Sequence, residues 1–382
     1  MLEIHMRFIR LCCSAVAISL MTPLVCLAAS PASFERHDYK AGSKPSAVAA
    51  ADLNADLLPD VAVVNPRALN ILYNQAGGAF AKAKTRGAGP APVGLALGEF
   101  NGDSRPDIAI LNRRGVRIIC SAPDGEMTYR TTLRMRGAFL GIAAADLDND
   151  GITDLAAGRV HFWGGSFGID HAEYFVRIYS GVGDGRFTRS QDYRVGKMPT
   201  AILPGDFNGD CRADLAVATA SNGGAIDVLY GQPGGGFADA AEYACPAAEA
   251  IASGDLNDDG RLDIALVSWR AQAVAILYGQ QTGFSAPVVY AVDRPGRGIA
   301  LGDFNGDGRL DIAVTRGKKD GCIAVLYSEA GGGFGQAVEY PVGRWPSGIV
   351  AVDLNGDSRL DLVVCNNHSR SVSVLLNTGN TP

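Results

Sequence analysis

Short apolar runs separated by polar turns recur along the chain. In one stretch, the small apolar segment 298–302 precedes an acidic segment, the runs 312–315 and 323–327 follow it, and a Gly-rich turn leads into a segment that ends at 338–340. Runs this short, rich in β-branched residues and bounded by Gly, Asn or Asp, are typical of strands. Because no helix-period stretch occurs after the first 30 or so residues, the pattern predicts an all-β protein with four strands per unit.

The acidic segment shows that this unit is repeated. The motif Asp-Leu/Phe-Asn-x-Asp-x-x-x-Asp recurs seven times, with small variations, at 52–60, 99–107, 146–154, 206–214, 255–263, 303–311 and 353–361. Successive copies begin 47 to 60 residues apart. Four strands per repeat, seven times over, predict a seven-bladed β-propeller with four-stranded antiparallel blades.

The two ends of the chain complement each other. The seventh repeat ends after its third strand, at 372–376, and residues 34–39 resemble a fourth strand placed before the first repeat. We expect the amino-terminal strand to complete the last blade and close the ring, since closure removes exposed sheet edges. The predicted propeller spans 33–377, followed by a tail at 378–382.

The Asp-x-Asn-x-Asp-Gly-x-x-Asp loop, repeated at blade spacing, resembles that of the FG-GAP or VCBS repeat family. This propeller type occurs in integrin α-subunits and in many secreted bacterial proteins, and the resemblance covers 33–377. It implies a propeller of the integrin-like, secreted kind. Some polysaccharide lyases and lectins share the propeller type, so an enzyme of that class is an alternative that the resemblance leaves open.

The loops carry the oxygen ligands that Ca²⁺ prefers. Side chains at positions 1, 3, 5 and 9 and a carbonyl at position 7 provide hard oxygens within one turn, and Ca²⁺ takes six to eight of them. Such an ion would be structural, because it uses the loop's acids and leaves no general base. The predicted ligands are Asp146, Asp148, Asp150, Asp154, Asp206, Asn208, Asp210, Asp214, Asp255, Asn257, Asp259, Asp263, Asp303, Asn305, Asp307, Asp311, Asp353, Asn355, Asp357 and Asp361.

Position 6 ranks the seven loops, because a left-handed turn there favours glycine. Gly151, Gly260 and Gly308 mark the best loops, whereas Cys211 and Ser358 weaken two others. Two loops are predicted to be weaker still, with the candidate ligands Asp52, Asn54, Asp56, Asp60, Glu99, Asn101, Asp103 and Asp107. The alternative for any loop is an Asx-turn satisfied by backbone hydrogen bonds alone.

The opposite face of the propeller is predicted to bind a partner. The seven loops hold more than half of the chain's 40 acidic residues, so the rest of the chain carries net positive charge. Trp163, Trp269 and Trp345, the three tryptophans, map to connections on the other face, together with Arg270 and Arg344. Since Trp and Arg are enriched in binding hot spots, we expect this face to bind an extracellular protein or glycan, possibly an anionic one.

The third repeat carries an aromatic insertion at 161–175, between its second and third strands. Long loops of this kind are often functional, and a hydrophobic cap over the ring is the alternative. The insertion contains His161 and His171, but two histidines ten residues apart on a Gly-rich loop are poor evidence for a metal site.

The amino terminus has the order of a secretory signal peptide. Basic residues precede an apolar run, and small residues follow it, so residues 1–28 are predicted to be removed. Cleavage after Ser30 or Ala32 is an alternative, Met6 is an alternative start, and a retained anchor is a further alternative. The mature protein is then secreted or periplasmic, without membrane insertion.

Composition narrows the function further. A net charge of −6 argues against a general nucleic-acid binder. No nucleophile elbow, zinc-protease motif or P-loop is present, so we expect no catalytic residues. Five cysteines remain after the signal, at separations that leave one disulfide open. The prediction is therefore a monomeric, secreted, calcium-binding module for a protein or glycan, with a lyase-like enzyme or a purely structural propeller as alternatives.

Overall fold

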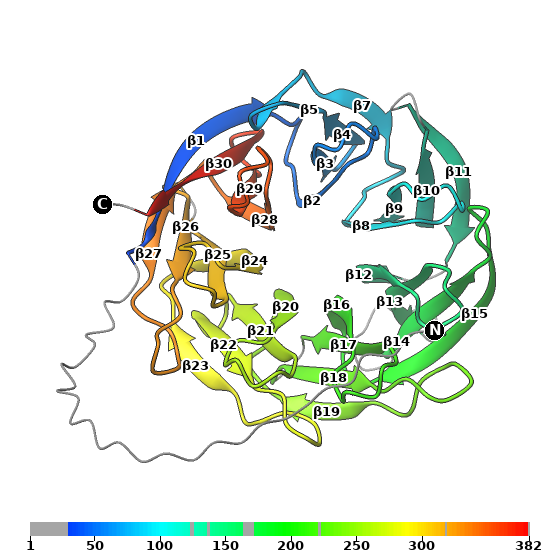
Figure 1. Cartoon of the computed structure of the whole chain (residues 1–382). Helices are drawn as coiled ribbons and strands as arrows, with labels where there is room; N and C mark the ends of the chain where they lie inside the picture. Colours follow the sequence, from blue (N-terminus) through cyan, green and yellow to red (C-terminus); the bar gives the residue numbers. More distant parts are fainter. Residues whose placement is uncertain are drawn as a thin grey trace, which may run out of the picture.

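Seven four-stranded antiparallel sheets surround a central axis in the computed structural model (Figure 1). The structure describes residues 30–122, 126–135, 138–162, 172–220, 223–317 and 319–380. In these ranges every regular element is a strand, and no helix is long and apolar enough to cross a membrane. The predicted all-β class and the seven-bladed propeller are confirmed.

Each blade runs from an inner strand beside the axis to an outer strand at the rim. Blade 1 comprises β2 (Ala47–Ala51), β3 (Asp60–Asn65), β4 (Ala68–Leu72) and β7 (Lys84–Gly87), and blade 2 comprises β8 (Gly94–Gly98), β9 (Asp107–Asn112), β10 (Gly115–Ser121) and β11 (Met127–Arg134). Blade 3 comprises β12 (Ala138–Ala145), β13 (Asp154–Phe162), β14 (Ala172–Gly181) and β15 (Phe187–Val195). Blade 4 comprises β16 (Pro199–Gly205), β17 (Asp214–Thr219), β18 (Ala225–Leu229) and β19 (Ala241–Ala244).

Blades 5 to 7 follow the same order. Blade 5 comprises β20 (Ala250–Gly254), β21 (Asp263–Ser268), β22 (Ala273–Leu277) and β23 (Val288–Ala291). Blade 6 comprises β24 (Pro295–Gly302), β25 (Asp311–Arg316), β26 (Cys322–Leu326) and β27 (Val338–Pro341). Blade 7 comprises β28 (Pro346–Val352), β29 (Asp361–Asn366), β30 (Ser371–Asn380) and β1 (Ala32–Lys40). A two-stranded ribbon, β5 (Asn74–Gln75) and β6 (Ala79–Phe80), extends blade 1.

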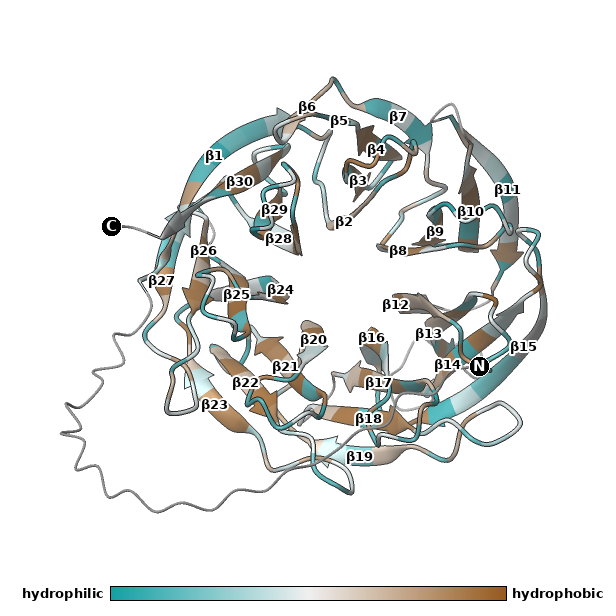
Figure 2. Ribbon diagram, in the orientation of Figure 1, coloured by the Kyte–Doolittle hydropathy of each residue, from teal (hydrophilic) through white to brown (hydrophobic). Residues whose placement is uncertain are grey.

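The hydrophobic core lies between neighbouring blades. Second and third strands are buried on both faces, whereas outer strands such as β27 alternate between half-buried and exposed positions. Figure 2 shows brown middle strands and largely teal stretches on the outer strands β1, β7 and β15. An aromatic pair joins the outer strand of one blade to the next blade, with ring centroids 4.9–5.5 Å apart: Tyr39–Phe80, Tyr193–Phe237, Tyr243–Phe284, Tyr290–Phe334 and Tyr340–Phe34.

Ring closure follows the prediction. Strand β1 pairs antiparallel with β30 along its whole length, from Ala32 opposite Asn380 to Lys40 opposite Ser371. The hydroxyl of Tyr340 in blade 6 donates to the carbonyl of Ala32 at 2.6 Å, so the closing strand also contacts the preceding blade. Because Ala32 and Ser33 have partners in β30, residues 378–380 belong to the last blade; the predicted tail is shorter than 378–382.

The aromatic insertion is partly strand. His161 lies opposite Glu173, and Phe162 lies opposite Ala172, so both ends of the predicted loop 161–175 lengthen the β13–β14 hairpin. Residues 163–171, with Trp163 and His171, lie outside the described residues, as does the predicted signal peptide at 1–28. The five cysteines of the described chain are all unpaired, and the disulfide that the sequence left open is not formed.

Candidate functional site

The seven acidic loops share one hydrogen-bonded frame between the inner and second strands of each blade. In the loop 255–263, the Asp263 carboxylate accepts from the backbone N–H of Leu256 at 2.9 Å and of Gly279 at 2.7 Å. The same two bonds recur at the ninth position of every loop, where the acid is buried: Asp60, Asp107, Asp154, Asp214, Asp263, Asp311 and Asp361. This acid therefore ties the loop to the end of the third strand.

These buried acids lie in a strongly negative environment. The pKa of Asp263 is raised to about 6, mainly by burial. Two backbone N–H donors lower it, and the nearby carboxylates of Asp259 and Asp255 raise it. The pKa of Asp311 rises to about 7 for the same reasons. A divalent cation offsets this cost, because it favours the charged form of every carboxylate around it.

The loop tips are Asx-turns. In the loop 303–311, the Asp303 carboxylate accepts from the backbone N–H groups of Gly306, Asp307 and Gly308. Position 6 has a positive φ in all seven loops, including those with Leu57, Ser104, Cys211 and Ser358 there. The backbone bonds of the Asx-turn alternative are thus present, and they hold the carboxylates in place for a cation at the same time.

An arginine at position 7 divides the loops into two groups that differ in charge, and this division differs from the ranking by glycine at position 6. In five loops the position-7 arginine pairs with the position-5 acid: Arg105–Asp103, Arg212–Asp210, Arg261–Asp259, Arg309–Asp307 and Arg359–Asp357. Position 7 is Leu58 in the first loop and Ile152 in the third. Since a paired guanidinium neutralises one carboxylate, these two loops retain more negative charge on their side chains.

The loop 146–154 has the strongest donor set for a cation. Asp146, Asp148 and Asp154 each present one carboxylate oxygen, and the three oxygens lie within 4.8 Å of one another. In the described part of the chain, it is the only such group of three metal-ligating acidic, His or Cys side chains. Burial, followed by the charge of Asp150, raises the pKa of Asp148. These residues fit Ca²⁺, an ion that prefers clustered carboxylate oxygens.

The first loop offers a direct test of the backbone argument. Leu57 has a φ of 69°, so its backbone is strained, and it is 89% exposed, so its side chain makes little contact. Leu57→Gly is expected to stabilise the fold by about 1 kcal/mol, because a left-handed non-glycine residue costs roughly that much. Thermal unfolding measures the change. Leu58→Gly, one position on, is the control and should destabilise; a stabilising effect at both positions contradicts the explanation.

The opposite face carries two of the three predicted tryptophans. Trp269, 50% exposed, lies on the β21–β22 turn beside the exposed Arg270, and Trp345, 40% exposed, lies on the connection from β27 to β28 beside Arg344. They belong to different blades, and the structure does not unite them into one group. Trp163 lies outside the described residues.

Trp345 belongs to a group of four aromatic and basic residues on two connections. Its ring stacks on that of His368, with centroids 4.7 Å apart, and the His368 N–H donates to the carbonyl of Arg344 at 3.1 Å. Arg370 is exposed on the same β29–β30 turn as His368. We call Arg344, Trp345, His368 and Arg370 the Trp345 patch. The sequence singled out Arg344 and Trp345; the ring stacking of His368 needed the fold.

Acidic residues share this face with the basic ones. Glu249 accepts from the backbone N–H of Trp269 at 2.7 Å, and Asp293 pairs with Arg294 and Arg316. Acidic side chains therefore pair with part of the basic surface around blades 5 and 6, a detail that counting residues outside the loops does not supply. The four residues of the Trp345 patch keep the aromatic and basic combination.

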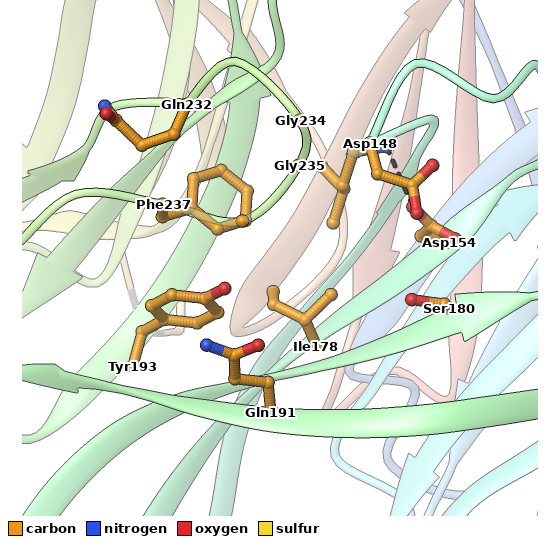
Figure 3. Close-up of a pocket in the computed structure, with 12 residues that line it drawn as sticks. Asp148, Asp154, Ile178, Ser180, Gln191, Tyr193, Gln232, Gly234, Gly235 and Phe237 are labelled. Atoms are coloured by element: carbon orange, nitrogen blue, oxygen red, sulfur yellow. Dashed lines mark hydrogen bonds between the residues drawn. The ribbon is translucent and has the colours of Figure 1, made fainter.

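A cavity of about 350 Å³ opens on the side of the acidic loops, between blades 3 and 4 (Figure 3). It adjoins the loop 146–154 and was not predicted. The lining residues are Leu147, Asp148, Asp154, Ile178, Ser180, Gln191, Tyr193, Gln232, Gly234, Gly235, Gly236 and Phe237. One signal was present in the sequence: Ser180 occupies a repeat position that is tyrosine in four other blades.

Comparison with known proteins agrees with this architecture. A model of the FG-GAP-like repeat matches residues 52–110, 100–157, 206–266, 255–314 and 303–364, which together exceed half of the chain. No curated protein matches the sequence.

Solved structures with similar folds share little sequence with this chain. BBS1N in complex with ARL6DN has a TM-score of 0.60 at 11% identity, over 93% of this chain and 99% of that one. The Dos1 propeller has a TM-score of 0.53 at 11% identity, over 88% and 79%. The exotype rhamnogalacturonan lyase YesX has a TM-score of 0.52 at 12% identity, over 92% and 76%. At these identities the likeness concerns the fold alone.

Proposed function

We propose that this chain, which belongs to the FG-GAP-like repeat family, is an exported recognition module that Ca²⁺ stabilises and that binds an extracellular protein or glycan. The acidic loops support the calcium part, because they gather carboxylates that need a cation. The signal-like residues 1–28 support export. The Trp345 patch supports binding, and it is the observation that carries the proposal.

The chemistry of the patch favours an anionic partner. Trp345 is 40% exposed although it stacks on His368, so part of a large apolar ring faces solvent. Arg344 precedes it in the chain, Arg370 is exposed on the turn that carries His368, and guanidinium groups pair with carboxylates in a bidentate manner. A flat apolar surface beside such groups suits uronic-acid glycans and acidic peptide segments. All four residues of the patch lie on connections between strands and not within them.

Trp345→Ala is expected to weaken binding at least tenfold without a change in melting temperature, because hot-spot aromatics contribute about 2 kcal/mol or more. Titration calorimetry against polygalacturonate, hyaluronate and poly-glutamate measures the affinity. Tyr129→Ala is the control, since Tyr129 is 52% exposed on the outer strand of blade 2. Failure of the wild type to bind any of the three probes, or equal affinity in Trp345→Ala, overturns the proposal. Release of unsaturated sugar products indicates a lyase instead.

A further inference from the structure

The cavity between blades 3 and 4 lies at a position where blade 3 differs from four of the other blades. In every blade, one backbone N–H at the end of the third strand donates to the ninth-position acid of the loop. Gly181 donates in this way to Asp154, and Gly231 donates to Asp214. The residue just before that donor is Ser180 in blade 3, Cys120 in blade 2 and Leu376 in blade 7, but tyrosine in blades 1, 4, 5 and 6: Tyr73, Tyr230, Tyr278 and Tyr327. The small side chain of Ser180 leaves open the space that a phenol ring fills in those four blades.

The tyrosines show what is missing. The hydroxyl oxygens of Tyr230 and Tyr243 lie 3.1 Å apart, and those of Tyr327 and Tyr340 lie 2.8 Å apart. The residue of blade 3 that corresponds to Tyr243 is Tyr193, which packs edge-on against Phe237 with centroids 5.2 Å apart. The ring of Tyr193 therefore lines the cavity opposite a serine, where its counterparts meet a second tyrosine (Figure 3).

Polar groups face the cavity from several sides. Asp148, Asp154 and Ser180 lie on one side, and the Gln191 amide lies on another (Figure 3). Gln232 lines the rim, and its amide nitrogen donates to the carbonyls of Tyr230 and Gly231. The loop 234–236 forms a further wall in which all three glycines have positive φ, and a Cβ on Gly235 would lie 3.5 Å from the Cβ of Asp148. Both donors and acceptors are thus available, next to the apolar surfaces of Ile178 and Phe237.

We infer that this cavity binds a single uncharged sugar ring. Its volume of about 350 Å³ is at the low end of ligand pockets, which span roughly 300–1,000 Å³, so it suits one ring. A sugar presents hydroxyl groups around its edge and C–H groups on its faces, which matches polar groups on several sides and the Tyr193 ring. An alkyl amine has only one polar end and cannot pair with Ser180 and Gln191 on different sides at once.

The charge of the cavity excludes acidic sugars. Of the described residues that line it, two are Asp and none is Lys or Arg. The adjoining loop holds four carboxylates, and one divalent cation leaves them in net excess. The inference concerns the face opposite the Trp345 patch and does not depend on binding there, so the two proposals fail separately.

The test uses the full-length mature protein and small probes. Saturation-transfer NMR and calorimetry are run with the methyl glycosides of glucose, galactose and mannose and with N-acetylglucosamine; glucuronate and putrescine are the charged comparisons. Measurements with Ca²⁺ and after chelation show whether sugar binding in the cavity depends on calcium in the adjoining loop 146–154. At least one neutral sugar is expected to bind in Ca²⁺, and neither charged probe is expected to compete with it.

Ser180→Tyr is the decisive variant, because it gives blade 3 the side chain that four other blades carry. It is expected to lower the affinity for the neutral sugar more than tenfold while the melting temperature stays the same or rises. If it does not fold, Gln191→Ala replaces it, because the Gln191 amide faces the cavity (Figure 3), and a loss of about fivefold is expected from one hydrogen bond. Gln280→Ala, which removes an exposed glutamine in blade 5, is the control. The inference is wrong if no neutral sugar binds, if glucuronate or putrescine binds instead, or if the folded variants bind as well as the wild type.

Discussion

Removal of Ca²⁺ with EDTA is expected to lower the melting temperature by about 5 °C for each occupied loop, since calcium at ~100 times its Kd stabilises by about 2.7 kcal/mol. The physical reason is the repulsion within loops such as 146–154, where three carboxylate oxygens lie within 4.8 Å of one another. Differential scanning calorimetry with and without chelator, together with elemental analysis, measures the effect.

Two opposite substitutions test whether the loops are responsible. Asp148→Asn gives the third loop the residue that other loops have at position 3; it should raise the melting temperature in EDTA and reduce the gain from Ca²⁺. Asn257→Asp makes the reverse change in the loop 255–263 and should enlarge that gain. An unchanged melting temperature in chelator, with no calcium in the purified protein, would falsify the calcium proposal.

Deletion of β1, residues 32–40, is expected to abolish the folded monomer. Phe34 packs against Tyr340 with centroids 4.9 Å apart, and Tyr39 packs against Phe80 at 5.3 Å. Phe34 and Tyr39 are partly buried. Loss of a fully buried aromatic side chain costs about 3–5 kcal/mol, and the deletion removes two partly buried ones together with a whole strand, whereas whole domains have only about 5–15 kcal/mol of stability. Deletion also exposes the β30 edge, which then pairs with other chains.

Size-exclusion chromatography and thermal unfolding measure the outcome of this deletion. A synthetic peptide of residues 30–41 should restore a monomer when added to the truncated chain during refolding. Arg36→Ala is the control, because Arg36 is a partly exposed partner of Asp38 and surface ion pairs contribute about 0–1 kcal/mol. A truncated protein that stays monomeric with an unchanged melting temperature would show that closure by β1 does not hold the ring together.

The fold was predictable because its information is local and repeated seven times. A blade needs four short strands and three turns, and each copy of the acidic loop marks the same turn. The missing fourth strand after 372–376 and the extra strand at 34–39 indicated closure, which the β1–β30 register confirms. The ends of strands were harder to place, since β13 and β14 continue into residues that resemble a loop.

The candidate sites depended on the sequence to different degrees. The acidic loops are contiguous segments, so their residues and their left-handed position 6 followed from spacing alone. Whether an arginine two positions on neutralises the loop acid, as Arg309 does for Asp307, depends on side-chain direction, which spacing does not supply. Charge counts likewise did not place Glu249 and Asp293 on the face that carries the tryptophans, because a count assigns no position.

By itself, the sequence determined the all-β fold class, the number of blades, the closing strand and the acidic loops. Each of these depends on short segments of neighbouring residues that can be compared from one repeat to the next. Only the tertiary structure decided what lies between blades. The cavity at Ser180 needs Tyr193 of one blade and Gln232 and Phe237 of the next, and the stacking of His368 on Trp345 joins two different connections. Such contacts join residues distant along the chain, and packing of whole blades is what brings them together.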